Sequence, residues 1–172
     1  MVLEAAMAEF GAHGLHGGTV EAIARRVGVS QPYLFHLFGT KKALFLAAIA
    51  LGFARTREAF ADAVRGLPQD EPHSTEVVLL AMGQAYGRLL RDRTLLQLQL
   101  QAYVSCDDPE VRVVVRDWFM GLQAYVASAS GADEAAIQDF FAIGMLMNVG
   151  ASIDAASINE NWARLLCPEV SA

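Results

Sequence analysis

The sequence has few cysteines and no long hydrophobic segment. Its two cysteines, Cys106 and Cys167, lie far apart without a partner pattern, so we expect two free thiols rather than a disulfide scaffold. No apolar run approaches the roughly 18 residues of a membrane span, and no charged, apolar and small-residue leader opens the chain. These absences predict a cytoplasmic protein that does not bind membranes.

The sequence also lacks the motifs of several enzyme classes. It contains no Glu-x-x-His pair for a carboxylate metal site, no Gly-rich phosphate loop and no Ser or Cys in a nucleophile motif. His13 and His16 form an HxxH pattern, but no set of Cys or carboxylate ligands accompanies them. We therefore expect neither a metal nor a cofactor, and a helical-bundle enzyme is an alternative without a supporting motif.

Hydrophobic residues are abundant for a chain of this size. They make up 54% of the 172 residues, and the mean hydropathy is +0.32. Such values are high for a soluble monomer, which indicates that apolar surface is buried against a partner or around a cavity. The length suits one compact unit, or a small head joined to a larger body.

Charge is unevenly distributed along the chain. The net charge is −6, but residues 1–57 carry +3 and residues 58–172 carry −9. The cations are thus concentrated in the N-terminal segment, which favours nucleic-acid binding by that segment alone. Because the cations are few, we expect tight binding to need two heads acting together.

The segment 19–45, TVEAIARRVGVSQPYLFHLFGTKKALF, predicts two short helices around a tight corner. Thr19 is a good N-cap, Gly28 suits the positive φ of a helix end, and Ser30 caps a second helix. The first helix has one apolar face, formed by Val20, Ile23, Ala24 and Val27. This pattern is typical of a helix-turn-helix.

The second helix of this motif has the features of a recognition helix. Pro32 suits its first turn, and Leu34, Leu37 and Phe38 are expected to be buried. The opposite face presents Gln31, Pro32, Tyr33 and His36, where a recognition helix reaches base edges. After a Thr40 cap, Lys41 and Lys42 are expected to project toward phosphates. The alternative is an ordinary corner between helices, with both lysines in solvent.

These residues, with the preceding LEAAMAEFGAHGLHGGT, resemble the DNA-binding domain of the TetR family of bacterial transcriptional regulators over residues 3 to about 50. The rest resembles the family in length, helical pattern and apolar composition. The resemblance implies an all-α fold of about nine helices. It places a helix-turn-helix DNA-binding domain at 1–48 and a helical ligand-binding and dimerisation domain at 49–172.

By the same resemblance, several residues of the motif occupy positions that commonly touch DNA. These residues are Thr19, Gln31, Tyr33, His36 and Lys41; Ser30, Pro32 and Lys42 of the same motif complete the predicted DNA-binding residues. Phe35 departs from the family, which often has a Tyr there whose hydroxyl bonds a phosphate. Relatives usually carry a short basic arm before the first helix, whereas the given sequence begins almost at that helix. Either the arm is absent or the given sequence is trimmed, so a minor-groove contact from an arm is an open question.

The body is predicted to be helical throughout. Helices are expected from Thr40 to about Val64, from Ser74 to about Arg91, from the caps Asp107 and Asp108 to about Ala129, from Asp133 onward and over 159–166. The segment 95–101, LLQLQLQ, alternates as a strand does, but no second strand pattern exists to pair with it. We interpret it as helix.

The segment 140–153, FFAIGMLMNVGASI, is uncharged on every side of the predicted helix, which favours burial against a second subunit. In the family the last two helices commonly form a four-helix dimer interface. The predicted interface residues are Phe140, Phe141, Gly144, Met147, Asn148, Ala151 and Trp162. A core helix in a monomer is the alternative.

An effector pocket is expected in the body, because the family holds small molecules there. The candidates combine apolar side chains with a few neutral polar groups, which favours a largely apolar effector. They are Met82, Tyr86, Gln97, Gln101, Trp118, Leu122 and Met145. We thus predict a homodimeric DNA-binding regulator, a repressor released from a palindromic operator by a small molecule. A bundle that binds no operator and acts as a partner-binding module or an enzyme is the alternative.

Overall fold

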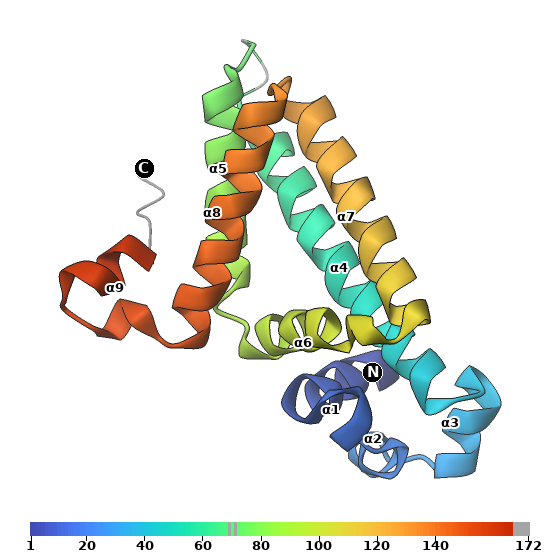
Figure 1. Ribbon diagram of the computed structural model, residues 1–172. Helices are drawn as coiled ribbons and strands as arrows, with labels where there is room; N and C mark the ends of the chain where they lie inside the picture. Colours follow the sequence, from blue (N-terminus) through green and yellow to red (C-terminus); the bar gives the residue numbers. More distant parts are fainter. Residues whose placement is uncertain (69, 71, 167–172) are drawn as a thin grey trace. The chain divides into compact units, whose positions relative to one another are not determined.

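The computed structural model describes residues 1–68, 70 and 72–166, and in this part of the chain it contains nine α-helices, two short 3₁₀ turns and no strand. The helices are α1 (Val2–Gly17), α2 (Val20–Val27), α3 (Gln31–Phe38), α4 (Lys41–Arg65), α5 (Thr75–Leu89), α6 (Arg93–Val104), α7 (Pro109–Ser130), α8 (Glu134–Ser152) and α9 (Asn161–Leu166) (Figure 1). The predicted all-α class is confirmed.

The chain packs into two compact units. Unit 1 contains residues 1–55 and 93–119, and unit 2 contains residues 56–92 and the chain from residue 120 onward. The long helices α4 and α7 therefore supply residues to both units. The predicted division at residue 48 separates functions rather than packing units, and it stays a prediction.

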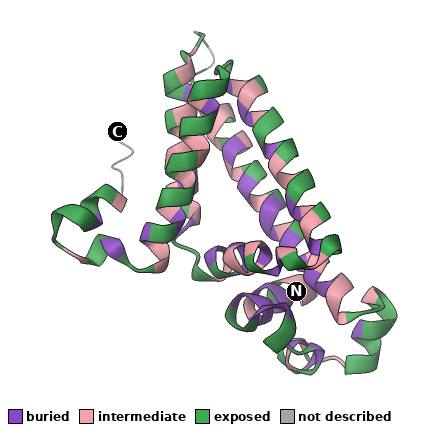
Figure 2. Cartoon of the chain, viewed as in Figure 1, coloured by how far each residue is buried: buried purple, intermediate pink, exposed green. Residues whose placement is uncertain are grey.

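In unit 1, α6 approaches α1 and α4 closely because glycines leave room for it. A Cβ added to Gly11 of α1 would lie 3.1 Å from the carbonyl oxygen of Thr94. A Cβ on Gly52 of α4 would lie 3.1 Å from Cδ1 of Leu95. The core beside this contact is built on Phe10, whose ring meets that of Phe45 edge to face at 5.2 Å. Figure 2 shows the buried stretches of α1 and α6.

In unit 2, α5 and α8 are joined by a buried hydrogen bond. The Tyr86 hydroxyl donates to Oδ1 of Asn148 at 2.9 Å, and Asn148 is 1% exposed. Phe60 lies next to this pair, with its ring edge to face against Tyr86 and Phe140. The pairing satisfies a polar amide inside an apolar bundle, where an unpaired one would be costly.

Most predicted helix starts are confirmed by capping bonds. Ser74 caps α5, Asp108 caps α7 and Asp133 caps α8 through side-chain acceptors. The segment 95–101 is helical, as expected. Helix α5 ends at Leu89 and α9 begins at Asn161, two residues from each predicted bound.

No single helix in the described ranges is long and apolar enough to cross a membrane. Only α3 and α4 taken together pass such a test by length and composition, across a bend of 71°.

Candidate nucleic-acid interface

The corner between α2 and α3 has the local geometry that the sequence predicts. Thr19 caps α2, with its hydroxyl accepting a hydrogen bond from the Ala22 amide at 3.2 Å. Gly28 ends α2 at φ 72°, a left-handed conformation that a residue with a Cβ adopts only with strain. Ser30 then caps α3 by accepting from the Tyr33 amide at 3.3 Å. The helix-turn-helix is therefore held by its own backbone and caps.

A buried carboxylate fixes the start of α2, and the sequence pattern did not reveal it. Oε1 of Glu9 accepts a hydrogen bond from the Thr19 amide at 3.0 Å, although Glu9 is only 7% exposed. A buried carboxylate is stable only when it is hydrogen-bonded or paired. Glu9 belongs to α1, ten residues earlier, and nothing in the local sequence marks it as inward-facing. The Glu9 carboxylate therefore stabilises the turn between α1 and α2.

Helix α3 exposes the four side chains that were expected to face base edges. Gln31, Pro32, Tyr33 and His36 are all exposed, and Pro32 lies in the first turn. Leu34 anchors the helix in the core with 1% exposure. The structure thus brings these four residues together on one short helix, as the prediction requires. Their contact with DNA stays a prediction.

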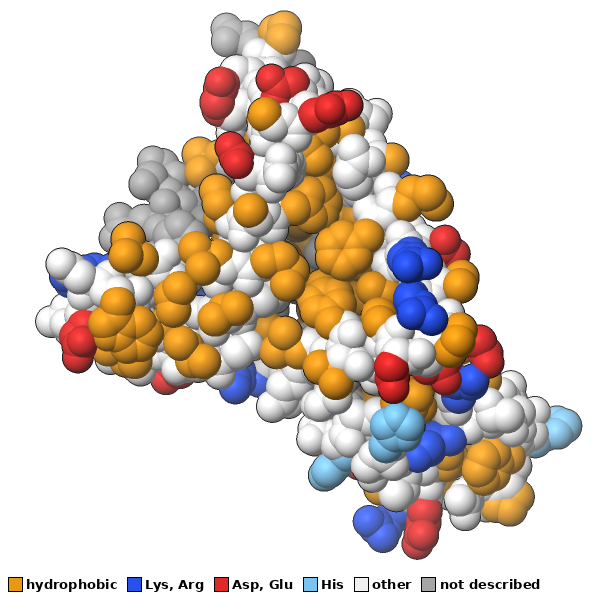
Figure 3. Space-filling model, viewed as in Figure 1, with side chains coloured by type: hydrophobic (Ala, Val, Ile, Leu, Met, Phe, Trp, Pro, Cys, Tyr) orange, Lys and Arg blue, Asp and Glu red, His pale blue; other side chains and the backbone are white. Residues whose placement is uncertain are grey.

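The prediction that Leu37 is buried is wrong. Leu37 is 50% exposed, and Phe38, also expected in the core, is only half-buried. Helix α3 has only about two turns and contacts the core mainly through Leu34. Its other apolar residues therefore stay at or near the surface. Phe35, at 40% exposure, is among them. Figure 3 shows hydrophobic side chains on the surface over α3.

Both lysines at the start of α4 were expected to project toward phosphates, but each is hydrogen-bonded within the chain. The Lys41 ammonium donates to the carbonyl oxygens of His16 at 3.1 Å and Gly18 at 3.2 Å. Lys41 therefore ties α4 to the turn between α1 and α2. A phosphate contact by this side chain needs those two hydrogen bonds to be exchanged.

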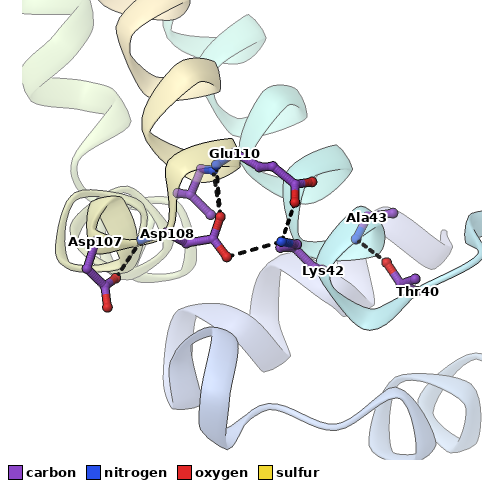
Figure 4. A network of polar contacts seen from close by, with 7 residues as sticks. Thr40, Lys42, Ala43, Asp107, Asp108 and Glu110 are labelled. Atoms are coloured by element: carbon purple, nitrogen blue, oxygen red, sulfur yellow. Dashed lines mark hydrogen bonds and ion pairs between the residues drawn. The ribbon is translucent and has the colours of Figure 1, made fainter.

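Lys42 forms ion pairs within unit 1. Its ammonium donates to Oδ2 of Asp108 at 3.2 Å and to Glu110, at the start of α7 (Figure 4). The hydrogen bonds to Glu110 and Asp108 raise the pKa of Lys42 above its ordinary value. Burial raises the pKa of the Asp108 carboxyl, but the bonds from Lys42 and from the Glu110 and Val111 amides outweigh it, so its net pKa is lowered. Lys42 holds α4 to α7 in this structure.

The seven predicted effector-pocket residues divide between the two units. Gln97, Gln101 and Trp118 belong to unit 1, and Met82, Tyr86, Leu122 and Met145 belong to unit 2. Trp118 stacks on Phe53 at 4.0 Å between ring centroids and donates its indole N–H to the Phe53 carbonyl oxygen.

Within unit 2, Met82 and Leu122 are buried, whereas Met145 is 39% exposed. The two glutamines differ as well, since Gln97 is exposed and Gln101 is half-buried. The seven residues are therefore not gathered within one unit, and the pocket stays a prediction.

The predicted dimer residues of α8 mostly contact other residues of unit 2. Phe140 meets Phe60, Asn148 bonds Tyr86, and Met147 reaches to 3.2 Å from where a Cβ on Gly87 would lie. Gly144 faces the Tyr86 ring, Phe141 and Ala151 are half-buried, and Trp162 of α9 is 46% exposed.

The apolar residues left on the surface of α8 are a different set. We call four of them the outer stripe of α8: Ile143, Leu146 and Val149 of the helix and Ile153 at its C-cap, with exposures of 46, 36, 48 and 50%. Figure 3 shows hydrophobic side chains gathered over α8 and α9. Sequence periodicity could not separate the two faces, because both are apolar.

Cys106 is a free thiol whose Sγ donates to the Ala102 carbonyl oxygen at 3.3 Å. Burial raises the pKa of the Cys106 thiol, which disfavours the reactive thiolate. Cys167 lies outside the described residues.

Comparisons with known proteins agree with this geometry. Residues 2–48 match the model of the family described as bacterial regulatory proteins, tetR family. Solved structures match nearly the whole chain. FadR from Bacillus subtilis, in complex with stearoyl-CoA, is 16% identical with a TM-score of 0.75, covering 98% of this chain and 94% of FadR.

Two further structures match over similar lengths. A TetR-like transcriptional regulator from Rhodococcus sp. is 25% identical with a TM-score of 0.60, and 96% of this chain and 88% of that chain are covered. The TetR family transcriptional regulator PfmR from Thermus thermophilus is 17% identical with a TM-score of 0.67, covering 99% of this chain and 96% of PfmR. No curated protein matches the sequence. The resemblance inferred from residues 3–50 is confirmed.

Proposed function

We propose that this chain, which has the fold of a TetR-family transcriptional regulator with a DNA-binding N-terminal domain, acts as a homodimeric repressor of an inverted-repeat operator. The observation that carries the proposal is α3, a capped helix behind a Gly28 corner that exposes Gln31, Pro32, Tyr33 and His36. A recognition helix presents such side chains to the major groove from its first turns.

The outer stripe of α8 supports the dimer. Three apolar side chains of α8 and Ile153 at its C-cap are one third to one half exposed, and Trp162 of α9 adds to the apolar surface of the same unit. A soluble protein rarely leaves such a surface uncovered. A second copy can cover it through a two-fold axis. Binding to an inverted repeat then requires the two heads to lie about 34 Å apart, one turn of DNA, or a multiple of this.

The proposed effector is a largely apolar small molecule. The fold neighbour FadR holds stearoyl-CoA, so a long acyl chain is the first effector class to test on this chain. Helix α4 (Lys41–Arg65) directly follows the helix-turn-helix and, like α7, supplies residues to both units, so we propose it as the element through which an effector alters the head. The effector can release DNA only if it binds the DNA-incompetent state more tightly.

The experiment is selection of binding sites from a pool of random duplexes with the full chain. We expect a palindrome to be enriched. A variant with Tyr33→Ala and His36→Ala should lose most specific affinity while sedimentation shows an unchanged dimer. If no palindrome is enriched, the operator function is refuted. Full operator affinity in the double variant would instead show that α3 is not the recognition helix.

A further inference from the structure

Three exposed side chains of α3 are apolar or aromatic, which packing does not explain. Tyr33, Phe35 and Leu37 are 48, 40 and 50% exposed, whereas Leu34 alone reaches the core. The helix QPYLFHLF contains no Arg, Lys, Asp or Glu. A solvent-facing helix surface is normally polar. These exposed side chains are therefore suited to contact apolar groups of a bound partner.

The bases differ in what they require from a protein in the major groove. Guanine is most often read by a bidentate Arg or Lys, and cytosine by Asp or Glu. Adenine is read by Asn or Gln, and thymine by apolar contact with its C5-methyl group. Helix α3 has none of these charged side chains. Besides His36, whose ring N–H can donate to a guanine acceptor, it exposes Gln31 and the three apolar or aromatic residues. Most of its exposed side chains therefore match adenine and thymine.

Tyr33 and Leu37 are the pair best placed for thymine contacts. They are four residues apart, so they lie on the same face of α3 with about 6 Å between their Cβ atoms. Successive base pairs rise by about 3.4 Å. The two side chains can therefore meet methyl groups one or two base steps apart. Phe35 lies on the other side of the helix, beside Gln31, because it is two residues from each member of the pair.

We propose that α3 reads thymine methyl groups, through Tyr33 and Leu37, and that the operator half-site is therefore rich in A·T pairs where α3 lies. This inference rests on the proposed operator function and specifies the bases that it recognises. Helix α3 lies within residues 2–48, which match the tetR family model, and this match makes the major groove the occupant proposed for Tyr33 and Leu37.

The test uses the palindrome obtained by selection, with each thymine replaced in turn by deoxyuridine, which lacks only the methyl group. We expect roughly fourfold weaker binding at each contacted thymine, the fold-change that corresponds to about 0.8 kcal/mol for one buried methylene-sized group. Leu37→Ala should bind the thymine and deoxyuridine duplexes equally at its own position. Leu80→Ala, which shortens an exposed leucine on α5, is the matched control and should keep the discrimination.

Two outcomes overturn the inference and leave the operator function intact. One is an enriched palindrome with G·C pairs throughout the half-site, and the other is thymine discrimination that Leu37→Ala and Tyr33→Ala both retain. Failure to enrich any palindrome refutes both proposals, and an apolar protein partner then becomes the occupant of this face. Equal thermal unfolding of Leu37→Ala and the unmodified chain shows that the variant is folded.

Discussion

The side chain of Asp108 has two separate roles that substitution can distinguish. Its Oδ1 caps α7 by accepting from the Glu110 and Val111 amides, and its Oδ2 accepts from the Lys42 ammonium. Asn keeps an acceptor for the cap but removes the charge, whereas Ala removes both. The pKa of the Asp108 carboxyl lies below its ordinary value, so the charged form is favoured by folding.

This shift gives a prediction for stability against pH. A carboxyl whose folded pKa is lowered stabilises the protein above its unfolded pKa of about 3.9, and this contribution is lost as the pH falls through the lower folded pKa. We expect Asp108→Asn to be less stable than the unmodified chain near neutral pH, with the difference shrinking below about pH 4. Urea unfolding at a series of pH values measures it. A difference that stays constant down to pH 2 would contradict the linkage.

At the scale of single residues, helix caps could be predicted from the sequence, whereas the tertiary partners of side chains could not. Thr19, Ser30 and Asp133 could be identified because a cap is a bond between residues three positions apart. The partner of Lys42 lies 66 residues away, and no local pattern links the two. The same distance effect hid the role of Lys41 and the exposure of Leu37, since each depends on how helices meet.

At the scale of the helix, Gly14 is the feature of α1 with the sharpest consequence. It lies within α1 at φ 70° and ψ −178°, a backbone region that essentially only glycine adopts. A Cβ there would also lie 2.6 Å from Oε1 of Gln101 on α6. The backbone conformation therefore favours glycine strongly, whereas the contact is with the far end of a flexible side chain that can move aside.

We expect Gly14→Ala to lower the free energy of unfolding by about 1–3 kcal/mol, the strain of a forced backbone conformation. Gly17→Ala is the matched control, because its Cβ would meet only Cβ of His13 at 3.4 Å and its φ is not positive. Urea unfolding followed by circular dichroism compares the two. If adding Gln101→Ala to Gly14→Ala restored full stability, the clash rather than the backbone would be the cause.

The positions of the helices were predictable from sequence because hydrophobic periodicity and caps are local. Which face of a helix is buried was not always predictable. The face of α2 could be read from Val20, Ile23 and Ala24, all buried as expected. In α8 the residues 140–153 are uncharged all round, so the sequence could not tell which side meets α5. In the structure Asn148 is buried and bonded to Tyr86 of α5, whereas Val149 is exposed.

At the scale of the whole molecule, the outer stripe of α8 predicts how the proposed dimer can be broken. In a two-fold interface each residue occurs twice, so Val149→Glu buries two carboxylates without partners. We expect dimer affinity to fall by at least about 100-fold, corresponding to roughly 3 kcal/mol. Sedimentation velocity at micromolar concentration should then show a monomer, and operator affinity should fall with it.

Val113→Glu is the control for this experiment. Val113 is 55% exposed on the part of α7 that belongs to unit 1, so the same new charge stays in solvent. Circular dichroism should show both variants folded, because neither valine is in the core. If the Val149→Glu protein remained dimeric, the interface would have to lie elsewhere than on the outer stripe of α8.

The hydrogen bonds of Lys41 and Lys42 have a consequence for how binding responds to ionic conditions. With both ammonium groups engaged inside the chain, Arg25 and Arg26 are the exposed cations left on the α2–α3 motif. Each phosphate neutralised on duplex DNA displaces about 0.9 condensed counterion. Two arginines on each of two heads therefore release few ions, so the proposed operator complex should tolerate a rise in cellular potassium that dissociates more cationic regulators.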